Sequence, residues 1–503
     1  MVKEFQEKLI ELKEYLKKLE YLKSAMALIQ WDSVVNMPAK AIHYRSEILG
    51  YLSGESYNIS TSNKIKEYVD FFSNKRDLDD ITKGTIEKIS KEYDRNKKIP
   101  KKEYTEYIIA GSISSAAWDE AKRKSDFKIF QPHLEKMVNY NQKFADYWGF
   151  KKNRYDALLD IYEPGITTEK LDEVFGNLRD AIVELLNKIK KSGNNPDIQF
   201  FNGNFPKDKQ EKLAKRIIYK MGYDYKEAGR VDESTHPFTT SFGNKDVRIT
   251  TNYDESDFRP ALFSCIHEAG HGIYEQDISD NLQGTLLGEG ASMGIHESQS
   301  RFYENIIGRN KNFWKFFYPG VVEQFPKFKD ISLEDFYRGI NYVEPSLIRT
   351  EADELTYSLH IIIRYEIEKA LINGDISVEE LPDVWNKKYK EYLGIEPKND
   401  REGVLQDIHW SDGSFGYFPS YALGNLYGAQ FLNKMKSDIS NIYQEIANGN
   451  LNVIHKWLKD NIHKYGCIYT PTELINKVTG EELSSKYFIQ YLNEKFKKIY
   501  NIK

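Results

Sequence analysis

The chain has 503 residues and a formal net charge of −5. This length allows a large core, and the mild negative charge gives no electrostatic footprint for nucleic acid. Only Cys265 and Cys467 could pair, and no run of about eighteen apolar residues occurs, so we expect neither a disulfide framework nor a membrane span.

The N-terminal residues form an amphipathic pattern and lack the apolar core of a signal peptide. Its apolar positions have helical spacing: Phe5, Leu9, Leu12, Leu16 and Leu19. This spacing predicts a helix packed against other helices of the same chain; the alternative is a coiled coil with a partner. With so few cysteines, we expect a reducing, cytoplasmic location.

Helical periodicity dominates the rest of the chain. One apolar face is formed by Leu171, Val174, Phe175, Leu178, Ile182 and Leu185. That segment ends at residues 191–193, before Pro196. We predict a mainly α fold. Because no repeat, low-complexity tract or long linker marks a boundary, we predict a single domain with lobes over residues 1–503.

Strand-like sequence is concentrated in residues 236–242 and 246–251. The short Gly-Asn-Lys connection between them predicts a β-hairpin. A strand in this place can bind an extended peptide by backbone pairing.

Directly after the hairpin comes His267-Glu268-Ala269-Gly270-His271. On a helix, positions i and i+4 share a face, so both imidazoles can reach one metal while Glu268 lies beside it. Asp257 and Pro260 are suited to the start of that helix. The motif predicts a water-activating peptidase site; a pair of surface histidines is the alternative.

A third metal ligand must come from elsewhere. Tyr274 and Asp277 stand where a longer motif would need glycine and histidine, which excludes a three-histidine site. Glu297, after a glycine-rich turn, is our predicted ligand. Glu275 competes, but two histidines and a carboxylate from one short helix would crowd the open position. His296 is expected to be an outer partner or solvated.

Residues 348–372 carry two stripes at helical spacing. The apolar stripe consists of Ile348, Ala352, Leu355, Leu359 and Ile363, and the polar stripe of Arg349, Asp353, Thr356 and His360. The polar stripe indicates either a solvent face or the lining of a water-filled groove.

Residues 406–421 mix aromatic, glycine and histidine residues without regular periodicity, which predicts a shaped loop. A tyrosine hydroxyl or a protonated histidine in such a loop can bind an oxyanion opposite a metal. The alternative is that these aromatic residues only pack.

Taken together, these segments resemble the carboxypeptidase Taq family of metallocarboxypeptidases. The resemblance covers nearly the whole chain in order, without a departure at the matching positions. Besides the metal motif and Trp31-Asp32, it is carried by residues 155–165, His236-Pro237-Phe238, residues 246–250, His296-Glu297-Ser298-Gln299, residues 348–353 and residues 416–424.

The resemblance implies a helical two-lobed body with a deep groove and a small β-sheet next to the metal helix. It also implies a homodimer that removes C-terminal residues from peptides with broad specificity. His267, His271 and Glu297 would hold Zn²⁺, or sometimes Co²⁺, and Glu268 would be the general base.

Further roles follow from the same resemblance. Arg349 would anchor the terminal carboxylate of the substrate, because a guanidinium can bind both of its oxygens. His409 and Tyr421 would be the oxyanion donors, with Tyr417 as an alternative, and His236 would lie near the substrate.

Two other functions stay open at this stage. An endo-acting zinc oligopeptidase would use the same chemistry and differ only in cleavage position. A non-catalytic scaffold could keep a metal for stability, but it would not need Glu268.

Overall fold

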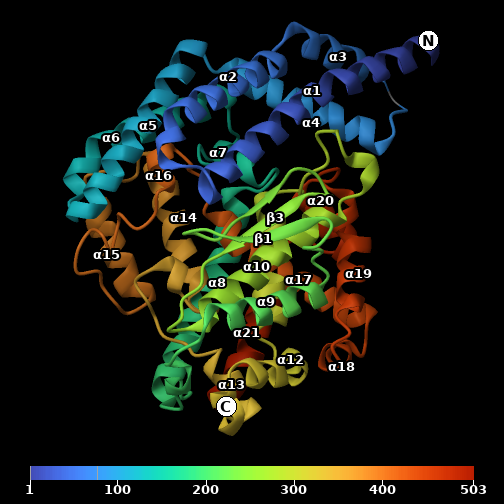
Figure 1. Cartoon of the computed structure of the whole chain (residues 1–503). Coiled ribbons are helices and arrows are strands. Elements are labelled where there is room, and N and C mark those ends of the chain that lie inside the picture. The colour runs from blue at the N-terminus through green and yellow to red at the C-terminus, as the bar shows by residue number, and fades with distance from the viewer. Residues whose placement is uncertain (1, 76) are drawn as a thin grey trace.

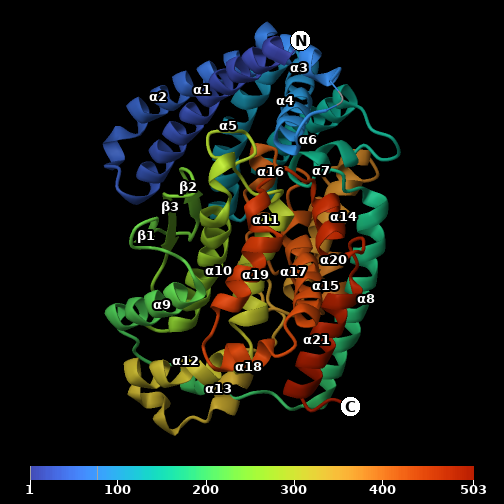
Figure 2. The ribbon, with the colours of Figure 1, turned by 90° about the vertical axis from the view of Figure 1, so that its right-hand side faces the viewer.

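The described residues of the N-terminal third of the chain form helices joined by short connections. A computed structural model describes residues 2–75 and 77–503. Figures 1 and 2 show helices α1 to α4 together on one side of the molecule. The helices are α1 (Val2–Val35), α2 (Ile42–Ser60), α3 (Asn63–Ser73), α4 (Asp80–Lys98), α5 (Lys101–Lys124) and α6 (Phe127–Trp148).

The helices from α7 onward build the larger body of the molecule. Its first half contains α7 (Asp156–Tyr162), α8 (Thr168–Ser192), α9 (Lys207–Met221), α10 (Phe258–Asp277), α11 (Met293–Arg301), α12 (Lys311–Gln324) and α13 (Leu333–Gly339). Its second half contains α14 (Tyr357–Asn373), α15 (Leu381–Tyr392), α16 (His409–Asp412), α17 (Pro419–Asp438), α18 (Ile442–Ala447), α19 (Asn452–Asn461), α20 (Pro471–Thr479) and α21 (Lys486–Ile499).

The predicted apolar stripe of α1 packs inside the chain. Leu12, Leu16 and Leu19 are buried against apolar residues of α3 and α4, which form a small core separate from the main one. This confirms helix-on-helix packing for the N-terminal segment. The separation of this small core from the main one agrees with the two-lobed body expected from the resemblance.

The stripe of α8 is also confirmed, because all six of its predicted residues are buried in the main core. The helix ends at Ser192, and Gly193 adopts φ 65°, a left-handed conformation that favours glycine. None of the helices over residues 2–75 and 77–503 combines the length and apolar composition needed to cross a bilayer.

The predicted hairpin is present, within a three-stranded sheet. β2 (Thr239–Ser241) pairs antiparallel with β3 (Val247–Thr251), while β1 (Gly229–Glu233) pairs parallel with β3 on its other side. The sequence analysis missed β1, because three of its five residues are charged. Trp31 of α1 lies over this sheet, with the guanidinium carbons of Arg230 and Arg248 at 5.1 and 4.6 Å from its ring centre.

The prediction of one continuous helical pattern from residue 348 is wrong for its first part. Residues 349–351 form a 3₁₀ turn, and α14 begins only at Tyr357. The side chain of Asp353 accepts hydrogen bonds from the backbone N–H of Leu355 and Thr356, which holds a turn before the helix. His360, from the predicted polar stripe, is fully buried and hydrogen-bonded to the Tyr389 hydroxyl.

The segment 406–421 is partly a loop, as predicted. It contains the short helix α16, and its last residues already belong to α17, so Tyr421 lies in a first helical turn. Pro419 favours that helix start because its fixed φ suits the first turn.

A groove of about 1870 Å³ separates the two lobes. Helices α1 and α4 line one wall, and β2, α10 and α11 line the other. The mainly helical fold with a deep groove and a small sheet beside α10 is therefore confirmed.

Candidate metal centre

Helix α10 carries the motif, and its local sequence explains its position. The Asp257 side chain caps the helix by accepting from the backbone N–H of Arg259 at 2.9 Å. Gly270 allows α11 to cross closely, since a Cβ there would lie 2.7 Å from the carbonyl oxygen of Gln299. The crossing brings the predicted third ligand to the two histidines.

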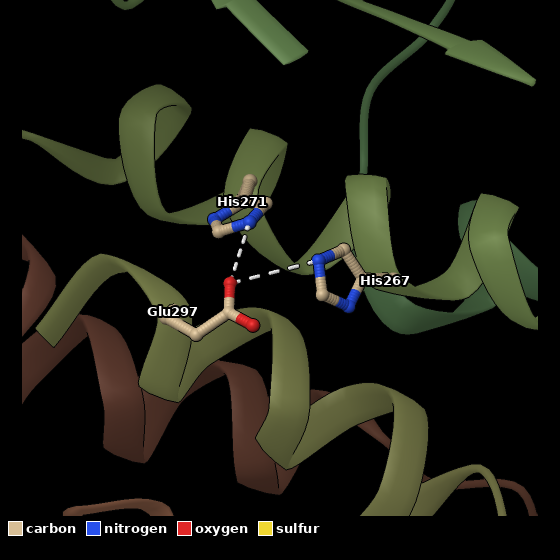
Figure 3. Close-up of side chains that lie close together, drawn as sticks. All are labelled: His267, His271 and Glu297. Carbon is tan, nitrogen blue, oxygen red and sulfur yellow. Dashed lines mark ion pairs between the residues drawn. The ribbon is translucent and has the colours of Figure 1, made fainter. Parts of the chain in front are cut away.

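The three predicted ligands converge, as Figure 3 shows. The Nε2 atoms of His267 and His271 lie 3.7 and 3.4 Å from Oε2 of Glu297. Within the described residues, this is the one group of three or more His, Cys, Asp and Glu side chains whose ligand atoms all lie within 4.8 Å of one another. Two imidazole nitrogens and one carboxylate oxygen are a donor set that suits a catalytic divalent metal.

The other nitrogen of each imidazole is held by a partner. His267 Nδ1 lies 2.9 Å from Glu304, so this nitrogen donates and Nε2 keeps its lone pair. His271 Nδ1 lies 2.6 Å from Nδ1 of His296, whose Nε2 lies 2.8 Å from Glu275. Because Glu275 only accepts, His296 donates to it and accepts from His271. Both ligand histidines therefore present Nε2 to one point.

The two candidate carboxylates differ in their surroundings. Glu275 is occupied by His296 and does not face the other ligand atoms, whereas Glu297 does. His296 takes the outer position that the sequence analysis expected.

Two residues that the sequence analysis missed fix Glu297 and His267. Arg301 Nε donates to Oε1 of Glu297 at 2.7 Å, which leaves Oε2 toward the histidines. Although burial raises the pKa of Glu297, Arg301 and the two imidazoles hold it well below its ordinary value. Glu304 lies in a π-helical turn, Phe302–Ile307, directly after α11. Arg301 and Glu304 follow Glu297 by four and seven residues, a spacing that predicts one shared helix face for all three side chains.

Glu268 lies beside the ligands and is oriented by the sheet. Its Oε2 accepts a hydrogen bond of 2.6 Å from the Thr239 hydroxyl on β2, which leaves Oε1 without this partner. Burial raises the pKa of Glu268 above its ordinary value. Thr239 was not predicted, since its partner is 29 residues away in sequence.

Arg349 lines the same groove and is buried. Its Nε donates to Oδ1 of Asp407 at 3.0 Å, and Nη1 donates to the Tyr357 hydroxyl at 3.3 Å. Its guanidinium carbon lies 4.8 Å from the ring centre of Tyr421.

His409, Tyr417 and Tyr421 form one aromatic cluster at the groove. His409 Nε2 lies 3.1 Å from the Tyr421 hydroxyl, and the rings of Tyr417 and Tyr421 meet edge to face at 5.1 Å. Burial lowers the pKa of His409 to about 4, so it is neutral at neutral pH. As a neutral imidazole, His409 can donate through only one of its two nitrogens.

His236 lies on the approach to β2. It is exposed and lines the groove, and its backbone carbonyl accepts from the Ser234 hydroxyl at 2.6 Å. The structure thus brings all the predicted site residues to the wall of one groove.

Two histidines and a glutamate that could hold a metal, with a neighbouring carboxylate and a peptide-sized groove, indicate the class of metallopeptidases. Comparison with known proteins agrees. The family model of the carboxypeptidase Taq (M32) metallopeptidases matches residues 11–496. The chain therefore belongs to this family, and it is a metallocarboxypeptidase that acts on peptides.

Individual relatives cover almost the full length. Carboxypeptidase 1 of Bacillus subtilis is 50% identical over 489 residues, covering 97% of each chain. Thermostable carboxypeptidase 1 of Thermus thermophilus is 37% identical, covering 97% of this chain and 98% of that protein. The solved structure of a Pyrococcus furiosus carboxypeptidase superposes with a TM-score of 0.95 at 36% identity, covering 97% of this chain and 99% of the other.

Proposed function

We propose that this metallocarboxypeptidase is zinc-dependent, with His267, His271 and Glu297 as the metal ligands and Co²⁺ as a possible substitute. The observation that supports this most directly is the convergence of both Nε2 atoms on one oxygen of Glu297. When bound, zinc supplies a Lewis acid that polarises the scissile carbonyl and lowers the pKa of water to about 7.

Glu268 is the general base of the proposed mechanism. Thr239 binds Oε2, so Oε1 is the oxygen that takes the proton of the attacking water and then passes it to the leaving amine. Because Glu268 is absent from the ligand group, its carboxylate stays available for this transfer.

Arg349 binds the terminal carboxylate of the substrate. Of its five N–H groups, the internal contacts to Asp407 and Tyr357 use at most three, which leaves at least two for the substrate. A guanidinium with N–H groups on both terminal nitrogens suits the two oxygens of a carboxylate.

Tyr421 donates to the oxyanion, and His409 orients it. Within the described residues, Nδ1 of His409 is buried without a hydrogen-bond partner, which favours the tautomer that carries its proton on Nε2. His409 then donates to Tyr421, and the tyrosine proton is free to point into the groove. Tyr417 is the alternative donor, and comparison of Tyr421→Phe with Tyr417→Phe decides between them.

The free edge of β2 supports the proposal of broad specificity, because a substrate peptide can pair with it through backbone groups. The backbone groups of Phe238 and Phe242 bond toward β3, so those of Thr239 and Ser241 point away from it, along an edge that lines the groove. An extended peptide bound there, next to His236, is recognised through atoms that every residue has.

We also place the enzyme in the cytoplasm as a homodimer. Both cysteines are free, which suits a reducing compartment. Helix α2 has no buried residue, and apolar side chains are exposed on α2 and α5: Ile42, Tyr44, Tyr51, Tyr104, Ile108, Ile109 and Ile113. Light scattering of the purified protein tests the dimer, and cell fractionation tests the location.

The deciding experiment is mass spectrometry of a decapeptide digested in free-acid and C-terminally amidated forms, with zinc, cobalt or a chelator. Stepwise loss from the free C-terminus, absent with the chelator and with the amide, supports the proposal. Internal fragments from both peptides would establish the endo-acting alternative. Arg349→Ala should reduce turnover of free-acid peptides far more than any turnover of amidated ones; equal losses contradict the anchoring role.

A further inference from the structure

We infer that Arg364 is a positioning residue for substrate binding: by sharing Asp407 with Arg349, it keeps one net positive charge at the place where the peptide carboxylate docks. This inference rests on the proposed role of Arg349 as the carboxylate anchor. Arg364 lies on α14 and has no exposed surface.

Asp407 connects the two arginines through different oxygens. Oδ1 accepts from Nε of Arg349 at 3.0 Å, whereas Oδ2 accepts from Nε of Arg364 at 2.7 Å. Burial raises the pKa of Asp407, but Arg364 and Arg349 outweigh this and hold the pKa well below its ordinary value. The carboxylate is therefore ionised and shared between two guanidinium groups.

Arg364 cannot itself bind a substrate, because all its nitrogens have partners inside the protein. Nε and Nη2 face Asp407 at 2.7 and 2.6 Å, and Nη2 also donates to Gln406 at 3.0 Å. Nη1 donates to the His360 carbonyl at 2.8 Å and to the Tyr389 hydroxyl at 3.1 Å. Its effect on a ligand must pass through Asp407 and Arg349.

The charge count explains why a fully buried arginine is placed here. Arg349 and Asp407 alone would form a neutral pair, and a substrate carboxylate would meet a guanidinium that is already neutralised. With Arg364 the three groups carry one positive charge. Burial lowers the pKa of His360 and His409, so neither histidine adds charge at neutral pH.

The test compares two competitive inhibitors, a pentapeptide with a reduced last peptide bond as the free acid and as the C-terminal amide. The measured quantity is the acid preference, the inhibition constant of the amide divided by that of the acid. Arg364→Met should lower this preference about tenfold or more, the size expected for a unit charge several ångströms away in a partly buried site. Adding Asp407→Asn to Arg364→Met removes the opposing charge and should restore most of the preference.

If Arg364 had a purely structural role, the double variant would show a lower acid preference than Arg364→Met alone. That result, or an unchanged preference in Arg364→Met, overturns the inference. If Arg364→Met does not fold, Asp407→Asn alone decides: the inference requires a preference equal to or above that of the wild type, and a loss overturns it. Arg349→Met is the reference variant. If it keeps the full acid preference, the proposed anchor fails; if only the Arg364 results fail, the anchor stands.

Discussion

Helix α17 supports the metal centre through a glycine that leaves no room for a side chain. A Cβ at Gly424 would lie 2.6 Å from Cγ of Glu297, whereas carbon atoms prefer separations of about 3.5–4.0 Å. Gly424→Ala therefore pushes Glu297 and α17 apart by about 1 Å. Metal-ligand distances tolerate only about 0.2 Å. We expect a loss of zinc affinity of at least about tenfold and a loss of stability of roughly 1–3 kcal/mol.

The matched control is Gly428, one turn further along the same helix. Its Cβ would have its nearest neighbour, the Ser298 carbonyl oxygen, at 3.4 Å, an ordinary contact. Gly428→Ala should therefore be neutral or stabilise the protein by up to about 1 kcal/mol, as alanine does in helices. Zinc affinity is measured by competition with a chromophoric chelator, and stability by denaturant unfolding of the metal-free protein. Equal effects of the two substitutions, or unchanged zinc affinity in Gly424→Ala, would refute this reasoning.

Glu268→Gln should lower kcat by about 10²–10⁴ while zinc affinity, measured by the same competition, stays nearly unchanged; a large loss of affinity would make Glu268 a ligand. Activity should be maximal at or above neutral pH, because the ligand histidines must be neutral and Glu268 ionised, and a maximum below about pH 5 would contradict this. Burial raises the pKa of Glu368 to about 7. In the unfolded chain this carboxyl loses its proton near pH 4.5, whereas in the folded protein it keeps the proton up to about pH 7. Its contribution to the free energy of unfolding is therefore fully present below about pH 4.5 and falls by about 3 kcal/mol in total as the pH rises to about 7. Unfolding free energies at several pH values should show a shallower decline in Glu368→Gln, and parallel curves would argue against it.

The convergence of His267, His271 and Glu297 could be predicted because each part has a local signal. His267 and His271 are one helical turn apart, and Asp257 marks the start of their helix. Glu297 followed from the need for a carboxylate on a later helix. These signals lie within short windows of sequence, where helical geometry fixes the relation between residues.

The partners of the site could not be predicted, because they depend on contacts across the fold. Thr239 meets Glu268 only when the sheet packs on α10, and Asp407 meets Arg364 across 43 residues of sequence. The continuous helix expected from residue 348 failed for a local reason: Asp353 competes for the backbone N–H groups that a helix would need. The periodic spacing of apolar residues does not reveal that a side chain will accept hydrogen bonds from the backbone and interrupt the helix.

The position of α1 and α4 over the groove has a consequence for what the enzyme can trim. A chain end that reaches Arg349 must enter the groove of about 1870 Å³ that residues of these two helices help to line. A folded domain of 100 residues has a radius of gyration of about 13 Å and cannot follow its own terminus into that space. We therefore expect the enzyme to trim a terminal segment that is detached from its folded domain, and to leave the same segment intact when it packs onto that domain.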